Sequence, residues 1–357
     1  MFSSTAVALF ASAALVAGHG IVTEVMVDGT WYTGTKNWDS PDNQKSPVRG
    51  IPFDTGFVWY NKVNTPDIAC SSAGYTPRPV TAPIKAGGTV GVRWGGDGGP
   101  DKLQWPHPEG PILAYLASCE GECSKFNPSN AKFFKISEEG LDPSKQGNSA
   151  GNDHVPWGQG MWAQNRIQYE NSYSWVTIPE DIAPGEYLLR HELISLHGAH
   201  TTAEGAQYYP ACIQLKVTGS GTSKPAGTLA TQLYSTQDGL VDIYVPSDKH
   251  GIAASSYKLP GPALYVPGKA SAPQVTTPAT TQAPASAAPT TTQPAAAAAN
   301  TQPDNQSPAS STTQPAYTGR CKAKRSMSLR DESRAVYDRA LARAQARHAH
   351  AMRRSIH

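Results

Sequence analysis

Short runs of β-forming residues, separated by turns rich in glycine and proline, dominate residues 19–267 of this chain. Apolar and polar side chains alternate most clearly over residues 185–193, and a period of two indicates a strand. Many short strands with Gly/Pro-rich connections predict an all-β fold, an immunoglobulin- or fibronectin-III-like β-sandwich with long loops. The loops 31–58 and 141–162 are long for a compact domain, which favours a functional role. The predicted strands are 21–27, 89–94, 112–117, 175–178, 186–197, 213–217 and 239–245.

Both ends of the chain differ in composition from this domain. Residues 1–18 are apolar and uncharged, with Val16 and Gly18 as the small residues of a signal-peptide cleavage site; the alternative is a buried N-terminal strand or helix. Residues 268–318 consist mostly of Ala, Pro, Thr, Ser and Gln, which predicts a disordered, O-glycosylated linker. Residues 319–357 hold 11 basic and three acidic residues and lack the paired cysteines of a cellulose-binding module.

The net charge of +2 conceals this basic tail, because the rest of the chain has 19 basic and 25 acidic residues. That balance does not predict a nucleic-acid-binding protein. No apolar run after the leader is long enough to span a membrane, so we expect a secreted, extracellular monomer. Secretion favours disulfides, and four of the five cysteines lie in the sandwich while Cys321 stands alone in the tail. The four are Cys70, Cys119, Cys123 and Cys212.

A hydrolase motif is present but lacks its structural context. The run Gly147–Gly151 fits the G-x-S-x-G pattern, which works only on a sharp turn from a strand to a helix. Neither flank has the pattern of such an element. A paired-carboxylate glycosidase is a second alternative, but no carboxylate pair can be nominated from the sequence. The histidines are more informative, and six lie in the sandwich away from a polar turn: His19, His107, His154, His191, His197 and His200.

Removal of residues 1–18 would make His19 the first residue of the mature protein. Its α-amine and the Nδ1 of its ring could then chelate one metal ion, and another histidine could add a third nitrogen. An imidazole-rich, tetragonal site of this kind favours Cu(II). His107 lies in a loop just before residues 112–116, His197 ends a predicted strand, and Gln207 and Tyr209 come just before Cys212.

In this order, the motifs of residues 19–265 resemble the fungal lytic polysaccharide monooxygenases of auxiliary activity family 9, formerly a glycoside hydrolase family. The motifs are His19-Gly20, His107 with Gly110-Pro111, Cys119–Cys123, Phe133–Ile136, Ile182–Glu192, Leu196-His197, Gln207–Cys212, Ile243-Tyr244 and Leu259–Pro262. The resemblance implies a β-sandwich with a flat copper-bearing face. It also implies oxidative cleavage of cellulose or a related β-1,4-glucan by hydroxylation at C1, C4 or both, with O2 or H2O2 and an external reductant.

The same resemblance assigns the site. His19, by its amine and ring, and His107 would hold one copper ion, with Tyr209 in the axial position. His197 and Gln207 would hydrogen-bond oxygen species beside the metal. The implied disulfides are Cys70–Cys212 and Cys119–Cys123.

One departure concerns the loop of His107. The family spaces this histidine as His-x-Gly-Pro, whereas here Pro108 and Glu109 separate it from Gly110, which is one residue more. The sequence leaves open C1 against C4 attack and the choice among glucans. It also leaves open a non-catalytic secreted β-sandwich that binds carbohydrate or copper. Exposed aromatic side chains for stacking on sugars could be Trp31, Tyr32 or Tyr234.

Overall fold

The computed structural model describes residues 20–35, 41–50, 56–96, 105–145, 160–170, 173–241, 243 and 257–268. The predicted signal peptide, His19, His154, the serine pattern at 147–151, Cys321 and the basic tail lie outside these residues. Only the first residue of the predicted linker lies within them.

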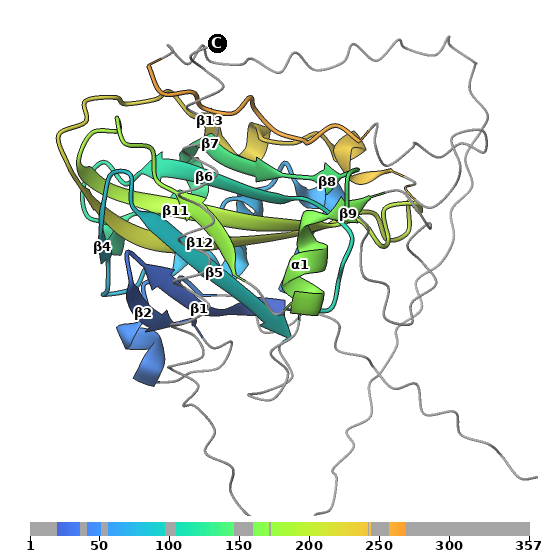
Figure 1. Cartoon of the computed structure of the whole chain (residues 1–357), viewed down its shortest axis with the longest axis horizontal. Coiled ribbons are helices and arrows are strands. Elements are labelled where there is room, and N and C mark those ends of the chain that lie inside the picture. Colours follow the sequence, from blue (N-terminus) through green and yellow to red (C-terminus); the bar gives the residue numbers. More distant parts are fainter. Residues whose placement is uncertain are drawn as a thin grey trace, which may run out of the picture. The chain divides into compact units, whose positions relative to one another are not determined.

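Two main β-sheets stack face to face, as the sequence predicts (Figure 1). One has four strands in the order β10 (Ser174–Thr177), β5 (Thr89–Gly96), β1 (Gly20–Val27) and β2 (Thr30–Thr33). The larger has the order β13 (Thr228–Leu229), β7 (Lys132–Glu139), β6 (Ile112–Ser118), β11 (Gly185–Ser195), β12 (Gln207–Thr218) and β3 (Val58–Trp59), with β4 (Ala82–Lys85) parallel to β12. A small hairpin joins β8 (Leu141–Asp142) to β9 (Met161–Trp162).

One α-helix, α1 (Ala163–Glu170), is described, and it lies at one end of the sandwich (Figure 1). Short 3-10 turns occupy the loops between the strands. They are η1 (Pro41–Lys45), η2 (Tyr60–Lys62), η3 (Pro66–Ile68), η4 (Ser72–Tyr75), η5 (Cys123–Lys125), η6 (Pro128–Asn130), η7 (Ala230–Gln232) and η8 (Thr236–Gly239).

Strand β11 is buried on both of its faces because the smaller sheet packs on one face and the loops pack on the other. Leu189 and Leu193 belong to the core between the two sheets, with side chains of β1 and β5. Leu188 and Ile194, which alternate with them, belong to a second core beneath the loop layer. Successive side chains of a strand point to opposite faces, so this one strand serves both cores.

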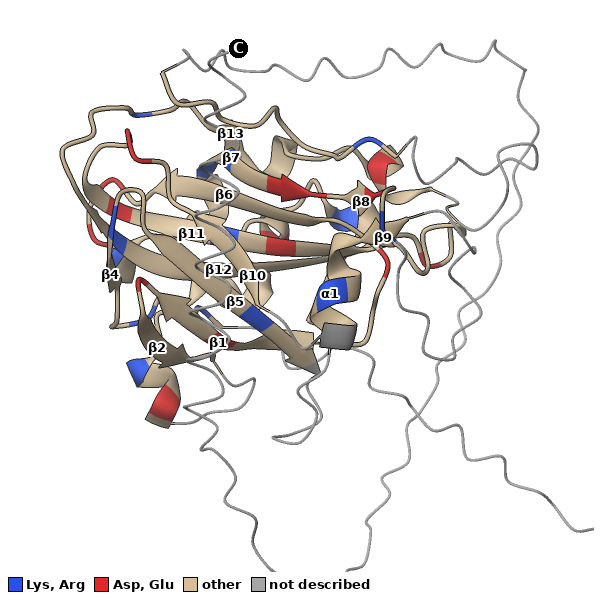
Figure 2. Ribbon diagram, in the orientation of Figure 1, with Lys and Arg blue, Asp and Glu red and all other residues tan. Residues whose placement is uncertain are grey.

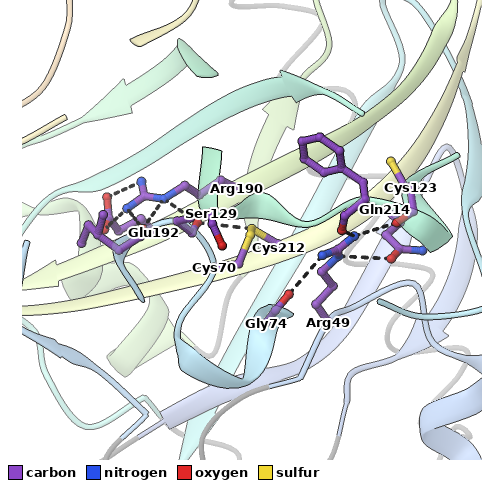
Figure 3. Close-up of a disulfide and its surroundings, with 12 residues drawn as sticks. Arg49, Cys70, Gly74, Cys123, Ser129, Arg190, Glu192, Cys212 and Gln214 are labelled. Atoms are coloured by element: carbon purple, nitrogen blue, oxygen red, sulfur yellow. Dashed lines mark hydrogen bonds and ion pairs between the residues drawn. A yellow bond between two sulfur atoms is a disulfide. The ribbon is translucent and has the colours of Figure 1, made fainter. Parts of the chain in front are cut away.

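The second core contains a fully buried ion pair beside a disulfide (Figure 3). Arg190 donates to the two carboxylate oxygens of Glu192 over 2.7 and 2.6 Å, and neither residue is exposed. Cys212, which pairs with Arg190 across β11 and β12, is bonded to Cys70. The 142-residue separation gives this disulfide about 4–5 kcal/mol of stabilisation in the chain-entropy model. The other implied disulfide, Cys119–Cys123, is also present.

Six of the predicted strands correspond to β1, β5, β6, β10, β11 and β12. The prediction of a strand over 239–245 was wrong for its described residues. Gly239 ends η8, which a capping box of Ser235 and Asp238 stabilises, and no strand is assigned to the described residues that follow. The prediction that His197 ends a strand was also wrong, because β11 ends at Ser195.

Basic and acidic residues are interspersed along the described strands and loops (Figure 2). Several of them form close ion pairs, such as Lys125 with Glu122 and Arg93 with Glu24. The described part of the surface therefore mixes both signs of charge.

Candidate metal centre

The register of three strands places the candidate residues at one end of the larger sheet. Leu193, near the end of β11, pairs with Tyr209 near the start of β12 and with Ile112 at the start of β6. The loop that carries His107 leads into β6, and His197 follows the end of β11. Residues separated by about 100 positions in the sequence therefore meet at this edge.

His107, His197, Gln207 and Tyr209 form one cluster there. The Tyr209 hydroxyl donates to Gln207 Oε1 over 2.6 Å and lies 3.3 Å from His107 Nε2. The His107 and His197 rings stack at 3.9 Å, only 10° from parallel. Since a phenol has one proton and the shorter contact is to Gln207, that proton points away from His107.

The start of β1 reaches the same cluster. Gly20, the first described residue, lies against the indole of Trp105, and a Cβ built on Gly20 would come within 2.4 Å of that ring. The same indole packs edge-on against His107 and Tyr209, with centroid distances of 5.5 and 4.9 Å. The residue after His19 thus packs on the same indole as two of the predicted ligands, although His19 itself is outside the described residues.

The described residues do not contain a complete set of charged or imidazole ligands for a metal ion. No set of three His, Cys, Asp or Glu side chains among them could hold a metal ion. Of the predicted ligands, His107 and Tyr209 lie among the described residues, and His19 directly precedes Gly20 in the chain. The position of Gly20, the imidazole of His107 and the phenol of Tyr209 fit a copper ion at this edge.

The longer loop after His107 contains a buried glutamate. Glu109 is 4% exposed, and its carbonyl accepts from the Leu196 amide over 3.1 Å. Burial raises the pKa of its carboxyl to about 7. Gly110 has φ 136°, and a Cβ there would come within 1.9 Å of the Ile194 carbonyl oxygen, so only glycine fits.

His191 has a structural position in the core between the sheets. Its Nδ1 accepts from the Trp94 indole over 3.0 Å, and its Nε2 lies 2.9 Å from the Ser174 hydroxyl. Burial lowers the pKa of this histidine to about 3. It therefore stays neutral at ordinary pH, and its hydrogen-bond partners are Trp94 and Ser174.

One exposed aromatic side chain near this edge was not predicted from the sequence. Trp59 is 40% exposed and pairs in register with Gln207, so both side chains lie on the same face of the sheet. Its ring packs on Phe57 at 4.7 Å, and Phe57 packs on Tyr209 at 5.5 Å. A tryptophan directly after the buried Val58 was the available signal, since alternation predicts that it points outward.

The three aromatic side chains that the sequence suggested for stacking on sugars differ in their exposure. Tyr234 is buried and donates to Glu192, so its predicted exposure was wrong. Tyr32 is half-buried, while Trp31 is 38% exposed on β2 of the smaller sheet. No described helix has the length and apolar character needed to cross a bilayer.

Known proteins of one family match this chain in sequence and structure. The profile of Auxiliary Activity family 9 (formerly GH61) matches residues 19–253. The AA9 family lytic polysaccharide monooxygenase A of Thermoascus aurantiacus is 40% identical over 255 residues, covering 69% of this chain and 99% of that protein. Monooxygenase I of Emericella nidulans is 40% identical over 266 residues, covering 73% of this chain and 66% of that protein.

Solved structures agree with the sequence matches. The extended catalytic domain of H. jecorina LPMO9A is 33% identical with a TM-score of 0.57, and the match covers 72% of this chain and 94% of that domain. The H. jecorina protein Cel61B is also 33% identical, with a TM-score of 0.56, over 69% of this chain and all of that one. The chain therefore belongs to Auxiliary Activity family 9, the family of the lytic polysaccharide monooxygenases.

Proposed function

We propose that this protein is a secreted, copper-dependent monooxygenase that cleaves cellulose or a related β-1,4-glucan by hydroxylating C1, C4 or both. The co-substrate would be O2 or H2O2, with electrons from an external donor. The observation that carries the proposal is the contact of Tyr209 with His107 at the edge where β1 begins. Family membership supports the reaction class.

Each residue of the cluster has a role that its contacts support. His107 would ligate copper with His19, whose α-amine exists only after residues 1–18 are removed. Tyr209 would help to hold the copper, because Gln207 fixes its hydroxyl beside His107. His197 would hold the plane of the His107 ring by stacking, and with Gln207 it would supply hydrogen-bonding groups beside the copper. Copper bound in this way supplies one-electron redox chemistry and oxygen activation.

The organisation of the whole chain follows from the same proposal. Residues 1–18 would be a signal peptide, 19–267 the catalytic sandwich, 268–318 an O-glycosylated linker and 319–357 a basic tail. The catalytic part would act as a monomer. Trp59, exposed next to Gln207, would contact the polysaccharide through its ring face.

The experiment uses the mature protein with copper, a reductant and several glucans, with mass spectrometry of the products. We expect oxidised oligosaccharides that depend on the reductant and vanish in His107→Ala. The oxidised carbon and the preferred glucan follow from the same spectra. Tight copper binding without oxidised products would instead support a non-catalytic copper-binding sandwich.

A further inference from the structure

Trp105 packs against three segments of the candidate copper site. Its side chain is completely buried, and its ring touches Gly20, His107 and Tyr209, which come from three different segments. Both ring contacts are edge-on, at interplanar angles of 84° and 85°. A rotation of this one indole would therefore displace all three neighbours.

A single glutamine fixes the indole. The Trp105 Nε1–H donates to Gln164 Oε1 over 3.0 Å, and the Ser195 hydroxyl donates to the same oxygen over 3.1 Å. The amide nitrogen of Gln164 donates to the carbonyls of Pro111 and Ile194 over 2.9 and 2.8 Å. Both polar atoms of this buried side chain thus have two partners, which leaves Gln164 one orientation.

Helix α1 also holds the two ends of the histidine loop. The backbone N–H of Gln164 donates to the Gly110 carbonyl over 3.3 Å. The side-chain amide of Gln168 donates to the Pro106 carbonyl over 3.0 Å. Residues four apart lie on the same face of a helix, so one face of α1 contacts the loop before and after His107. The loop has an extra residue, and these bonds fix where its ends lie.

We propose that Trp105 and Gln164 are positioning residues that set the geometry of His107 and Tyr209 relative to the start of β1. This inference rests on the proposed copper function. Neither residue ligates the metal. Gln164 acts through Trp105, and Trp105 acts through its ring contacts with the ligand segments.

The test compares Trp105→Phe, Trp105→Leu and Gln164→Leu in the mature chain beginning at His19, loaded with Cu(II). Phenylalanine keeps an aromatic ring and loses the N–H, whereas leucine loses both. Removal of groups that orient metal ligands commonly weakens metal binding about 10- to 100-fold. We expect Cu(II) affinity to fall in the order wild type, Phe, Leu, with altered copper electron paramagnetic resonance parameters in each variant.

Gln214→Leu is the matched control. Gln214 is also a buried glutamine, and its Oε1 accepts from Arg49 (Figure 3). Its amide nitrogen donates to the carbonyls of Arg78 and Val80. It lies five residues along β12 from Tyr209, about 17 Å away. We expect this variant to lower the unfolding midpoint of the apo-protein and leave the copper spectrum unchanged.

The outcomes separate the two proposals. If His107→Ala abolishes tight copper binding while the Trp105 and Gln164 variants keep wild-type affinity and spectrum, the positioning role is wrong and the copper site stands. If His107→Ala also binds copper like the wild type, the copper proposal itself fails. A spectrum that changes equally in Gln214→Leu would assign the effect to general destabilisation and overturn the inference.

Discussion

His191 gives this protein a specific sensitivity to acid. Because its Nδ1 accepts from Trp94, the neutral ring must carry its proton on Nε2 and donate it to Ser174. Protonation of Nδ1 would break the bond to Trp94 and place a charge in the core. Burial accordingly lowers the pKa of His191 to about 3, from 6.5 in the unfolded chain.

The sign and size of the effect follow from linkage. A histidine with a lowered folded pKa stabilises the fold above the unfolded pKa, and this stability is lost as the pH falls from 6.5 toward 3. Between pH 7 and pH 5 the unfolded state takes up the proton and the folded state does not. The free energy of unfolding therefore falls by about 2 kcal/mol from this group alone.

The assay is denaturant unfolding of the apo-protein at pH 7 and pH 5, for the wild type and His191→Gln. The variant cannot titrate at this position, so the difference between the two proteins isolates His191. Burial raises the pKa of Glu109 to about 7, so protonation of this group increases the free energy of unfolding as the pH falls from 7 to 5. Both proteins contain Glu109, so its contribution cancels in the comparison. Between pH 7 and pH 5 we expect the free energy of unfolding to fall by about 2 kcal/mol more in the wild type than in the variant. Equal losses would refute the reasoning.

Three further predictions concern stability and substrate contact. Glu192→Ala leaves the fully buried Arg190 unpaired and should lower the free energy of unfolding by about 3–5 kcal/mol, whereas an exposed pair would cost under about 1 kcal/mol. Replacing Cys70 and Cys212 by alanine should cost about 4–5 kcal/mol in the same unfolding assay, and a loss near zero would contradict the loop-closure argument. Trp59→Ala should weaken binding of the apo-protein to cellulose by about 1 kcal/mol, roughly fivefold, and unchanged binding would remove Trp59 from the substrate surface.

The sequence allowed the sandwich to be predicted because its main strands carry clear local signals. In 185–193 the period of two is visible, and turns of glycine and proline bound the other long strands. The short strands β3 and β13, with two residues each, have no such period and depend on pairing with β12 and β7. Helix α1 was missed because Ile167 is its main apolar core residue, and much of its contact with the domain is polar.

The sequence predicted which residues form the candidate site, but it did not predict the residues that support them. His107, His197, Gln207 and Tyr209 were all identified by motif, and strand register brings them to one edge. Trp105 and Gln164 carry no motif, since their importance arises only when the loop, α1 and β11 come together. Long-range contacts of this kind leave no local pattern in a single sequence.

The central claim is that the amine of His19 and the ring of His107 hold copper together. The most direct test is Cu(II) titration, followed by electron paramagnetic resonance, of two proteins that differ only by one alanine placed before His19. The added residue turns the amine into an amide and leaves both imidazoles in place. We predict a dissociation constant tighter than about 1 μM for the protein beginning at His19 and at least tenfold weaker binding for the extended one. Equal affinities and identical spectra would contradict the account.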